Sequence, residues 1–152
     1  MLELQLPPFD KKIVEKGKKM QIFDDIRRKY VALTPEEWVR QHFVHYLIGE
    51  KECPQTLMNN EVTLTLNGMS RRCDTVVYDR TLQPLLIVEY KAPSVAITQK
   101  VFDQICRYNM VLQVRWLIVS NGLVHYCCRI DPATLSYSFV DHIPTYTEMT
   151  GE

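Results

Sequence analysis

The sequence predicts a mixed α/β fold in which one β-sheet is flanked by helices. A capped helix is followed by a meander of three strands, and a second amphipathic helix then precedes two more strands. The third strand of the meander, residues 85–91, is apolar on both faces, which is typical of a central strand that is covered on each side. A chain of 152 residues is long enough for one domain with a substantial core.

Residues 1–30 are expected to form an N-terminal leader, with a short amphipathic helical segment over residues 20–30. Residues 31–152 are expected to form a single globular domain. The leader is rich in basic residues, which could contact phosphate groups, although a solvated face is the favoured interpretation. These residues are Lys16, Lys18, Lys19, Arg27, Arg28 and Lys29.

The first helix of the domain is predicted over residues 34–48, with Gly49 ending it. Thr34 is a good N-cap, Pro35 suits the first turn, and Glu37 completes a Thr-x-x-Glu capping box.

Helical periodicity assigns different roles to the two neighbouring glutamates. Glu37 is expected to cap the helix, whereas Glu36 and Arg40 fall within the apolar stripe. Glu36 is therefore expected to face the core or an adjoining cleft, either in a functional site or in an ion pair with Arg40. The apolar members of this stripe are Val39, Phe43, Tyr46 and Leu47.

Three strands are predicted next. Residues 61–66 alternate between apolar and polar side chains, and Asn67-Gly68 is a strong two-residue hairpin signal. Residues 71–78 then return antiparallel, and a turn over residues 79–84 leads into the central strand.

The second helix is predicted over residues 98–112, followed by strands over residues 114–119 and 123–130. The tail is expected to add a strand over residues 137–140 before fraying. The predicted core stripe of the helix consists of Val101, Ile105, Tyr108 and Leu112.

The composition limits the classes of function and the cellular environment that the sequence allows. The 18 basic and 18 acidic residues cancel, which argues against strong autonomous DNA binding but allows a nuclease whose substrate another domain delivers. Five cysteines without a Cys-x-x-Cys pair indicate reduced thiols in a cytoplasmic protein rather than disulfides or a zinc site. No apolar run approaches the roughly 20 residues of a membrane span, and the N-terminus does not resemble a secretory signal.

The central strand carries the strongest functional signal. Glu89 and Lys91 are two residues apart, so their side chains share one face, and Asp74 lies on the preceding strand. Asp74, Glu89 and the carbonyl of Tyr90 could hold a hard divalent cation. Lys91 would orient or deprotonate an attacking water, or contact the scissile phosphate. The alternative is a structural cluster with a buried ion pair.

Other polar residues have weaker signals. Gln104 and Tyr108 are four residues apart and are expected to share a helix face, whereas Arg72 and Arg107 are candidate phosphate contacts. His42 and His45 are three residues apart on the first helix, but no third metal ligand is evident near them. Both histidines are expected at the surface. Ser94 and Ser120 have no evident neighbouring base that could activate them as nucleophiles.

Three motifs together resemble the PD-(D/E)xK nuclease superfamily in its Gln-x-x-x-Tyr subgroup. They are Cys73-Asp74, Glu89-Tyr90-Lys91 and Gln104-x-x-x-Tyr108. Residues 26–41 resemble the N-terminal nuclease domain of type I restriction enzyme R subunits, and the similarity extends from about residue 20 to residue 130. Cys73 stands where the name-giving proline of the superfamily would be.

The resemblance implies a restriction-endonuclease-like fold and Mg2+-dependent DNA cleavage, with Mn2+ as a possible substitute. It implies metal ligands at Asp74 and Glu89, a catalytic Lys91 and a supporting acid on the first helix, for which the helical periodicity favours Glu36. The translocating ATPase of R subunits has no counterpart in this sequence. The expected partners are therefore DNA and a translocase subunit, a specificity subunit or a second copy. The alternative function is a non-catalytic DNA-binding or assembly module.

Overall fold

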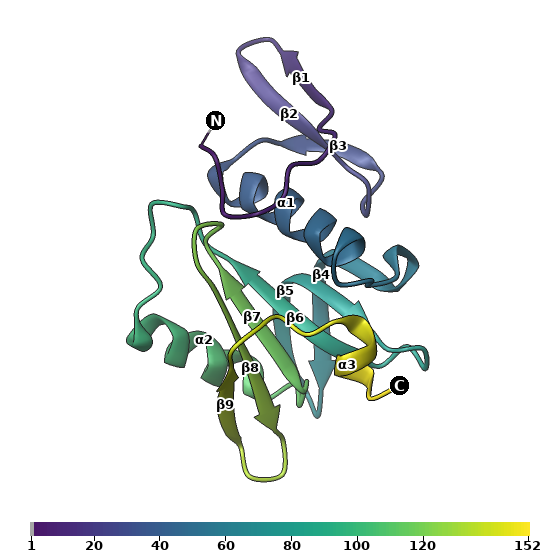
Figure 1. Cartoon of the computed structure of the whole chain (residues 1–152), viewed down its shortest axis with the longest axis vertical. Helices are drawn as coiled ribbons and strands as arrows, with labels where there is room; N and C mark the ends of the chain where they lie inside the picture. Colours follow the sequence, from purple (N-terminus) through teal and green to yellow (C-terminus); the bar gives the residue numbers. More distant parts are fainter. Residues whose placement is uncertain (1) are drawn as a thin grey trace.

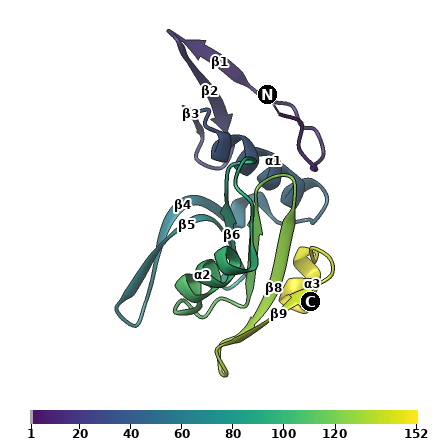
Figure 2. The same ribbon diagram turned by 90° about the vertical axis from the view of Figure 1, so that its left-hand side faces the viewer.

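The computed structural model describes residues 2–152, in which helix α1 (Pro35–Gly49) lies between two β-sheets (Figure 1). The smaller sheet is antiparallel and precedes α1. Its β1–β2 hairpin projects away from the body of the protein (Figure 2). The three strands of this sheet are β1 (Ile13–Lys16), β2 (Lys19–Asp24) and β3 (Lys29–Ala32).

The larger sheet has six strands in the order β4-β5-β6-β7-β8-β9. Only β6 and β7 are parallel, because helix α2 (Gln99–Met110) connects them, while all other neighbours are antiparallel. The strands are β4 (Met58–Leu66), β5 (Met69–Tyr78), β6 (Pro84–Tyr90), β7 (Trp116–Ser120), β8 (His125–Asp131) and β9 (Ser136–Val140), with a short 3-10 helix η1 (Gln55–Leu57) before β4.

The six-stranded sheet separates two apolar cores. Leu86 and Val88 of β6 pack on the α1 side with Phe43, whereas Ile87 packs on the α2 side with Phe102. The central strand is therefore covered on both faces, and the predicted mixed sheet flanked by helices is confirmed. The five cysteines are free and buried. None of the helices in residues 2–152 has the length and apolar character needed to cross a membrane.

The prediction of a helical segment in the N-terminal leader is wrong, because strands β1, β2 and β3 lie within residues 13–32. The register places Ile13, Ile22 and Val31 in one row, and Ile22 is fully buried. This row supplies the apolar face that holds the sheet against the body. The strands are too short, and too rich in lysine, for their alternation to be recognised from the sequence.

The tail also differs from the expectation, since it ends in helix α3 (Tyr146–Thr150) rather than fraying. Thr145 and Glu148 form a reciprocal capping box. Tyr146 and Met149 are buried in the core on the α1 side of the sheet. Their burial anchors a helix of only five residues.

Helix α1 begins with Thr34 as N-cap, because its hydroxyl accepts a 3.1 Å hydrogen bond from the Glu37 N–H. The helix is buried almost all round from Glu37 to Val44, since the six-stranded sheet covers one side and the N-terminal segment covers another. The expectation of surface histidines is therefore wrong for His42, whereas His45 stays partly exposed. His42 is buried, and His45 stacks on Phe9 with ring centroids 4.2 Å apart.

Candidate functional site

The acids singled out in the sequence meet where β5 and β6 separate. The antiparallel ladder pairs Thr75 with Val88, and Asp74 and Glu89 are the next residues beyond this pair. The Oδ2 atom of Asp74 accepts a 2.9 Å hydrogen bond from the backbone N–H of Tyr90. The Asp74 side chain thus takes the place of a backbone carbonyl as hydrogen-bond acceptor for β6, and it lies directly beside the Glu89-Tyr90-Lys91 segment.

A local irregularity in β4 and β5 positions Asp74. The ladder pairs Asn60 with Thr75 and Val62 with Cys73, but it skips Glu61, which has a positive φ of 56°. Thr75 bonds residues on the α1 side, whereas Cys73 packs in the core on the α2 side. Because neighbouring strand residues normally alternate in face, β5 must change face at the intervening Asp74.

Glu89 and Lys91 extend toward the α2 side of the sheet. They continue the alternation of Ile87, which belongs to the core on that side. Their side chains, like that of Asp74, are partly buried. The backbone N–H of Lys91 donates a 2.9 Å hydrogen bond to the carbonyl of Ser120, so β7 fixes the position of the lysine at the end of β6.

The charges of this cluster are incompletely compensated. Burial raises the pKa of Asp74, and the Tyr90 N–H and the Arg40 guanidinium offset this only in part. Burial also raises the pKa of Glu89, and the nearby charge of Asp74 raises it further. The ammonium group of Lys91 acts in the opposite direction on the pKa of both carboxyl groups. The three charged groups therefore lie close enough to interact.

Lys91 nevertheless makes no direct ion pair within the part of the chain that the structure describes. Among residues 2–152, its nitrogen has no carboxylate oxygen within 4.0 Å. A structural ion pair buried for stability requires close, well-formed contact, because desolvation otherwise exceeds the attraction. The observed arrangement is a poor example of such a pair.

The oxygen atoms present suit a hard divalent cation better than zinc. No group of three or more His, Cys, Asp and Glu residues suited to a metal ion occurs in the described part of the chain. Asp74 and Glu89 offer two carboxylates, and the carbonyl of Tyr90, the residue after Glu89, could add a third oxygen. Mg2+ commonly uses one or two protein carboxylates and keeps several waters.

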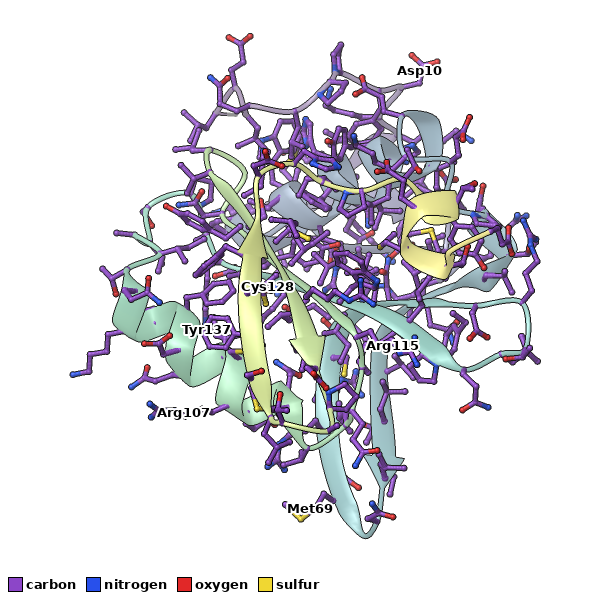
Figure 3. All side chains as sticks on the ribbon, turned by 60° about the horizontal axis from the view of Figure 1, so that its bottom comes forward. Asp10, Met69, Arg107, Arg115, Cys128 and Tyr137 are labelled. Carbon is purple, nitrogen blue, oxygen red and sulfur yellow. The ribbon has the colours of Figure 1, made fainter. Side chains whose placement is uncertain are left out.

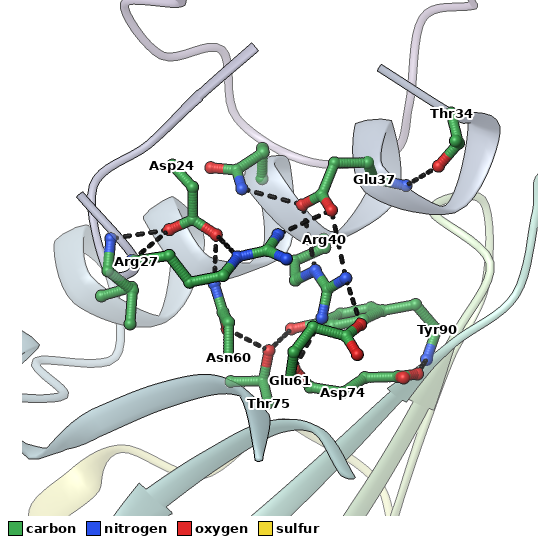
Figure 4. Close-up of polar contacts among 12 residues, drawn as sticks. Asp24, Arg27, Thr34, Glu37, Arg40, Asn60, Glu61, Asp74, Thr75 and Tyr90 are labelled. Atoms are coloured by element: carbon green, nitrogen blue, oxygen red, sulfur yellow. Dashed lines mark hydrogen bonds and ion pairs between the residues drawn. The ribbon is translucent and has the colours of Figure 1, made fainter. Parts of the chain in front are cut away.

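A second charged cluster lies on the other side of the sheet, beneath α1 (Figure 4). Arg40 is at its centre and donates to both carboxylate oxygens of Glu37 at 3.0 and 3.1 Å and to Glu61 at 2.6 Å. It also donates to the backbone carbonyl of Asp74 at 2.7 Å. Arg40 therefore links this network, called here the α1 network, to the backbone of the candidate site.

The α1 network continues to the small sheet. Arg27 bonds Asp24 and Glu37, while the buried Asn60 donates to Asp24 at 2.9 Å. Thr75 joins Asn60 to the hydroxyl of Tyr90. Burial alone would raise the pKa of Asp24, but hydrogen bonds from the Arg27 backbone, Asn60 and the Arg27 side chain hold that pKa below its ordinary value.

The structure exchanges the expected locations of the two α1 glutamates, since Glu37 rather than Glu36 points into the protein. Glu36 is exposed, so the expectation that it faces the core or a cleft is wrong. Glu37 is buried and contacts Arg27, Arg40 and Gln41, and it is not seen to cap the helix with its side chain. Helical periodicity identifies a single apolar stripe, whereas α1 is buried on two sides. The pairing partners of Arg40 are Glu37 and Glu61 rather than Glu36.

The Gln-x-x-x-Tyr pair lies on an exposed face of α2. Gln104 and Tyr108 are both exposed, so the expectation that Tyr108 belongs to the core stripe is wrong. The Arg71 guanidinium stacks on the Tyr108 ring at 4.4 Å and bonds its carbonyl, which ties this helix to β5. No hydrogen bond within residues 2–152 joins Gln104 or Tyr108 to the acids of the candidate site.

The two candidate phosphate contacts are exposed but dispersed. Arg72 pairs with Glu61 at 3.1 Å, so its charge is partly engaged. Arg107 projects outward from α2 near the β4–β5 hairpin, whose tip carries Met69 (Figure 3). The structure does not bring these two arginines together.

Ser120 does have a neighbouring base, contrary to the expectation. Its hydroxyl lies 2.7 Å from Nδ1 of His125, whose Nε2 is 2.9 Å from the carbonyl of Gln5. Ser120 is fully buried, and its hydroxyl also accepts from the Gly122 N–H at 2.9 Å. These bonds hold the β7–β8 turn against the N-terminal segment, so the pair is structural.

Sequence reasoning missed the polar residues that connect the two sides of the site. Asn60, Glu61 and Thr75 lie in predicted strands or at their ends, where alternation alone does not show which polar side chain turns inward. Asn60 lies directly opposite Thr75 in the antiparallel ladder, and this polar pairing becomes evident only once the register is known.

The comparisons with known proteins agree with this architecture. Residues 35–144 match the family described as type I restriction enzyme R protein N terminus. A solved fragment assigned as an HsdR subunit of a type I restriction enzyme from Vibrio vulnificus YJ016 is 19% identical, with a TM-score of 0.55. The similarity covers 78% of this chain but 25% of that one. No curated protein matched the sequence. The family match spans most of the chain, which therefore belongs to the type I restriction enzyme R protein N-terminal family.

Proposed function

We propose that this chain is a Mg2+-dependent DNA endonuclease of the PD-(D/E)xK type that acts in restriction of foreign DNA. The observation that carries the proposal is the cluster of Asp74, Glu89 and Lys91 at the end of the central strand of a restriction-family domain. The lysine makes no ion pair with the two acids within the described residues, which leaves it free to act on a substrate.

Each residue of the cluster has a role that follows from its position. Asp74, Glu89 and the Tyr90 carbonyl would hold Mg2+, with Mn2+ as a substitute. The bound ion would neutralise charge developing on the phosphate and make a coordinated water more acidic. Lys91 would orient the attacking water or contact the scissile phosphate. The hydrogen bond from the Tyr90 N–H keeps Asp74 aligned with these groups.

Cleavage assays test this proposal. Purified protein is incubated with supercoiled, linear duplex, single-stranded and branched DNA in Mg2+ or Mn2+, with a chelator as the blank. We expect metal-dependent cleavage that is lost in Asp74→Ala and Lys91→Ala and retained in the exposed control Lys100→Ala. Circular dichroism and thermal melts establish that each variant is folded. Absence of cleavage on every substrate in both metals would contradict the proposal.

The second candidate is a non-catalytic DNA-binding or assembly module, in complex with a translocase, a specificity subunit or a second copy. The α1 network is the observation that favours this module, because its buried polar side chains are all hydrogen-bonded and such a rigid scaffold can serve assembly as well as catalysis. DNA affinity that persists in Lys91→Ala, together with no cleavage by the unmodified protein, would support this candidate instead.

A further inference from the structure

The small sheet has two unlike faces. The row of Ile13, Ile22 and Val31 packs inward, so side chains of the alternate rows form the outer face. In the register, Lys16 lies opposite Lys19 and Phe23 lies opposite Tyr30. Lys12 shares this face, since its carbonyl bonds the Phe23 N–H and its nitrogen lies 5.4 Å from the Phe23 ring. No strand residue on the outer face is acidic.

The charges of the lysines on this face are not engaged by acidic side chains among the described residues. Lys12, Lys16 and Lys19 are exposed, and none forms an ion pair in the part of the chain that the structure describes. Lys16 and Lys19 are directly opposed across two strands, an arrangement of like charges that destabilises a sheet. A bound polyanion would relieve this repulsion.

Aromatic rings lie next to these charges. Phe23 and Tyr30 meet edge to face with centroids 5.1 Å apart, and Tyr30 is 40% exposed. Rings presented on the face of a sheet beside lysines are suited to stacking with unpaired bases while the lysines contact phosphates. In a base-paired duplex the bases are stacked on one another, so this face favours a single strand.

The sheet also explains how a neutral chain can hold a polyanion. Residues 11–30 contain eight basic and three acidic residues, so the remainder of the chain is correspondingly acidic. The sheet lies before residues 35–144, the part matched by the family, and projects from the body (Figure 2).

We propose that the outer face of β1, β2 and β3 is a binding site for single-stranded DNA. Lys12, Lys16 and Lys19 contact its phosphates, and Tyr30 and Phe23 stack with its bases. The inference rests on the proposed function for the choice of DNA as the polyanion. It replaces the interpretation of the N-terminal lysines as a merely solvated face.

Binding is measured without metal, so that it does not depend on cleavage. The full chain is titrated into a fluorescent oligothymidylate of about 20 nucleotides in chelator, and anisotropy is recorded over a range of salt concentrations. The triple variant Lys12→Gln, Lys16→Gln, Lys19→Gln is expected to bind at least about tenfold more weakly and to lower the salt slope by about 2, as three lost phosphate contacts require. Tyr30→Ser should weaken binding about fivefold or more without changing that slope, whereas Tyr30→Phe should bind normally.

The matched control Arg80→Gln, Lys100→Gln, Arg129→Gln removes the same charge from exposed positions outside the small sheet. Equal loss of affinity in the two triple variants would overturn the inference, as would tighter binding of a duplex of the same length. Binding to anionic phospholipid vesicles but not to the oligonucleotide would also overturn it and indicate a membrane surface. If the strand binds as expected but no DNA is cut in metal, the proposed function fails while this site stands.

Discussion

The α1 network and the candidate site are two charged clusters on opposite sides of the same strands, and they differ in how their charges are compensated. In the α1 network, hydrogen bonds and ion pairs outweigh burial and lower the pKa of Asp24 and Glu61. In the candidate site, burial raises the pKa of Asp74 and Glu89, and Lys91 stands near them without pairing. In one cluster the bonds outweigh burial, whereas in the other burial outweighs the bonds and the nearby positive charges.

The difference indicates that the two clusters have different purposes. Asp74 belongs to both, because its backbone carbonyl bonds Arg40 while its side chain faces Tyr90 and Glu89. The bonded network therefore holds the backbone that presents the uncompensated acid. A rigid supporting layer beneath a strained set of charges is what a functional site requires. Breaking each cluster in turn should consequently give different results.

The largest expected effect is on cleavage by a change in the candidate site. Glu89→Gln keeps the shape of the side chain but removes a charged ligand, so we expect the cleavage rate in Mg2+ to fall about 10²- to 10³-fold. Glu36→Gln, at an exposed position, should leave the rate unchanged. Initial rates of plasmid nicking measure both. A large loss of cleavage rate in Glu36→Gln, with a normal rate in Glu89→Gln, would contradict the assignment of Glu89 rather than Glu36 to the candidate site.

The next effect is on stability, through the α1 network. Arg40→Met leaves Glu37 and Glu61 without their shared partner and orphans the Asp74 carbonyl. Loss of one partner from a buried pair costs about 3–5 kcal/mol of unfolding free energy. Urea denaturation measures the change, and Arg129→Met is the exposed control. A loss below about 1 kcal/mol would show that the network contributes little.

A smaller effect of opposite sign is expected at Asp74. Asp74→Asn retains an oxygen that can accept from the Tyr90 N–H but removes a carboxylate whose charge the fold disfavours. The free energy of unfolding at pH 7 should therefore stay the same or rise, while cleavage is lost. Glu37→Gln should lower stability under the same conditions. If Asp74→Asn instead proved the more destabilising change, Asp74 would be a structural acid.

The smallest effects appear in the pH dependence of stability. Asp24 has a lowered pKa, so its contribution is present above its unfolded pKa of about 3.9 and is lost as the pH falls through the lower folded value. Asp74 and Glu89 have raised pKa values, so their penalty exists at neutral pH and disappears as the pH falls through those values.

Unfolding free energies between about pH 3 and 7 separate these contributions. Compared with the unmodified protein, Asp24→Asn should lose less unfolding free energy as the pH falls, because the contribution of the Asp24 carboxylate is already absent. The double variant Asp74→Asn, Glu89→Gln should lack the gain in unfolding free energy that protonation of these two carboxylates brings. Changes of the same sign in both variants would contradict the contrast between the clusters.

Much of the six-stranded sheet was predictable from the sequence because local signals agreed with the tertiary structure. The Asn67-Gly68 turn, the Thr34 cap and the apolar run of β6 each have one dominant interpretation. The Thr-x-x-Glu spacing of Thr145 and Glu148 is a comparable local signal for the start of α3.

The remaining features depend on contacts that a single sequence does not show. The reversal of Glu36 and Glu37 follows from burial of α1 on two sides, which no single amphipathic stripe can represent. The position of Asp74 follows from a change of face at a residue with ordinary strand sequence around it. The segregation of charge on the small sheet follows from its register, which short strands with many lysines do not specify.

The most direct test of the central claim, that Asp74 and Glu89 are left uncompensated for a divalent cation, is calorimetric titration of the protein with Mn2+. We predict that the unmodified protein binds the ion, more tightly at pH 7 than at pH 4, where the raised pKa values leave the carboxyl groups largely protonated, and that Asp74→Asn with Glu89→Gln abolishes this binding while the protein stays folded. No uptake by the unmodified protein, or equal uptake by the double variant, would contradict the account.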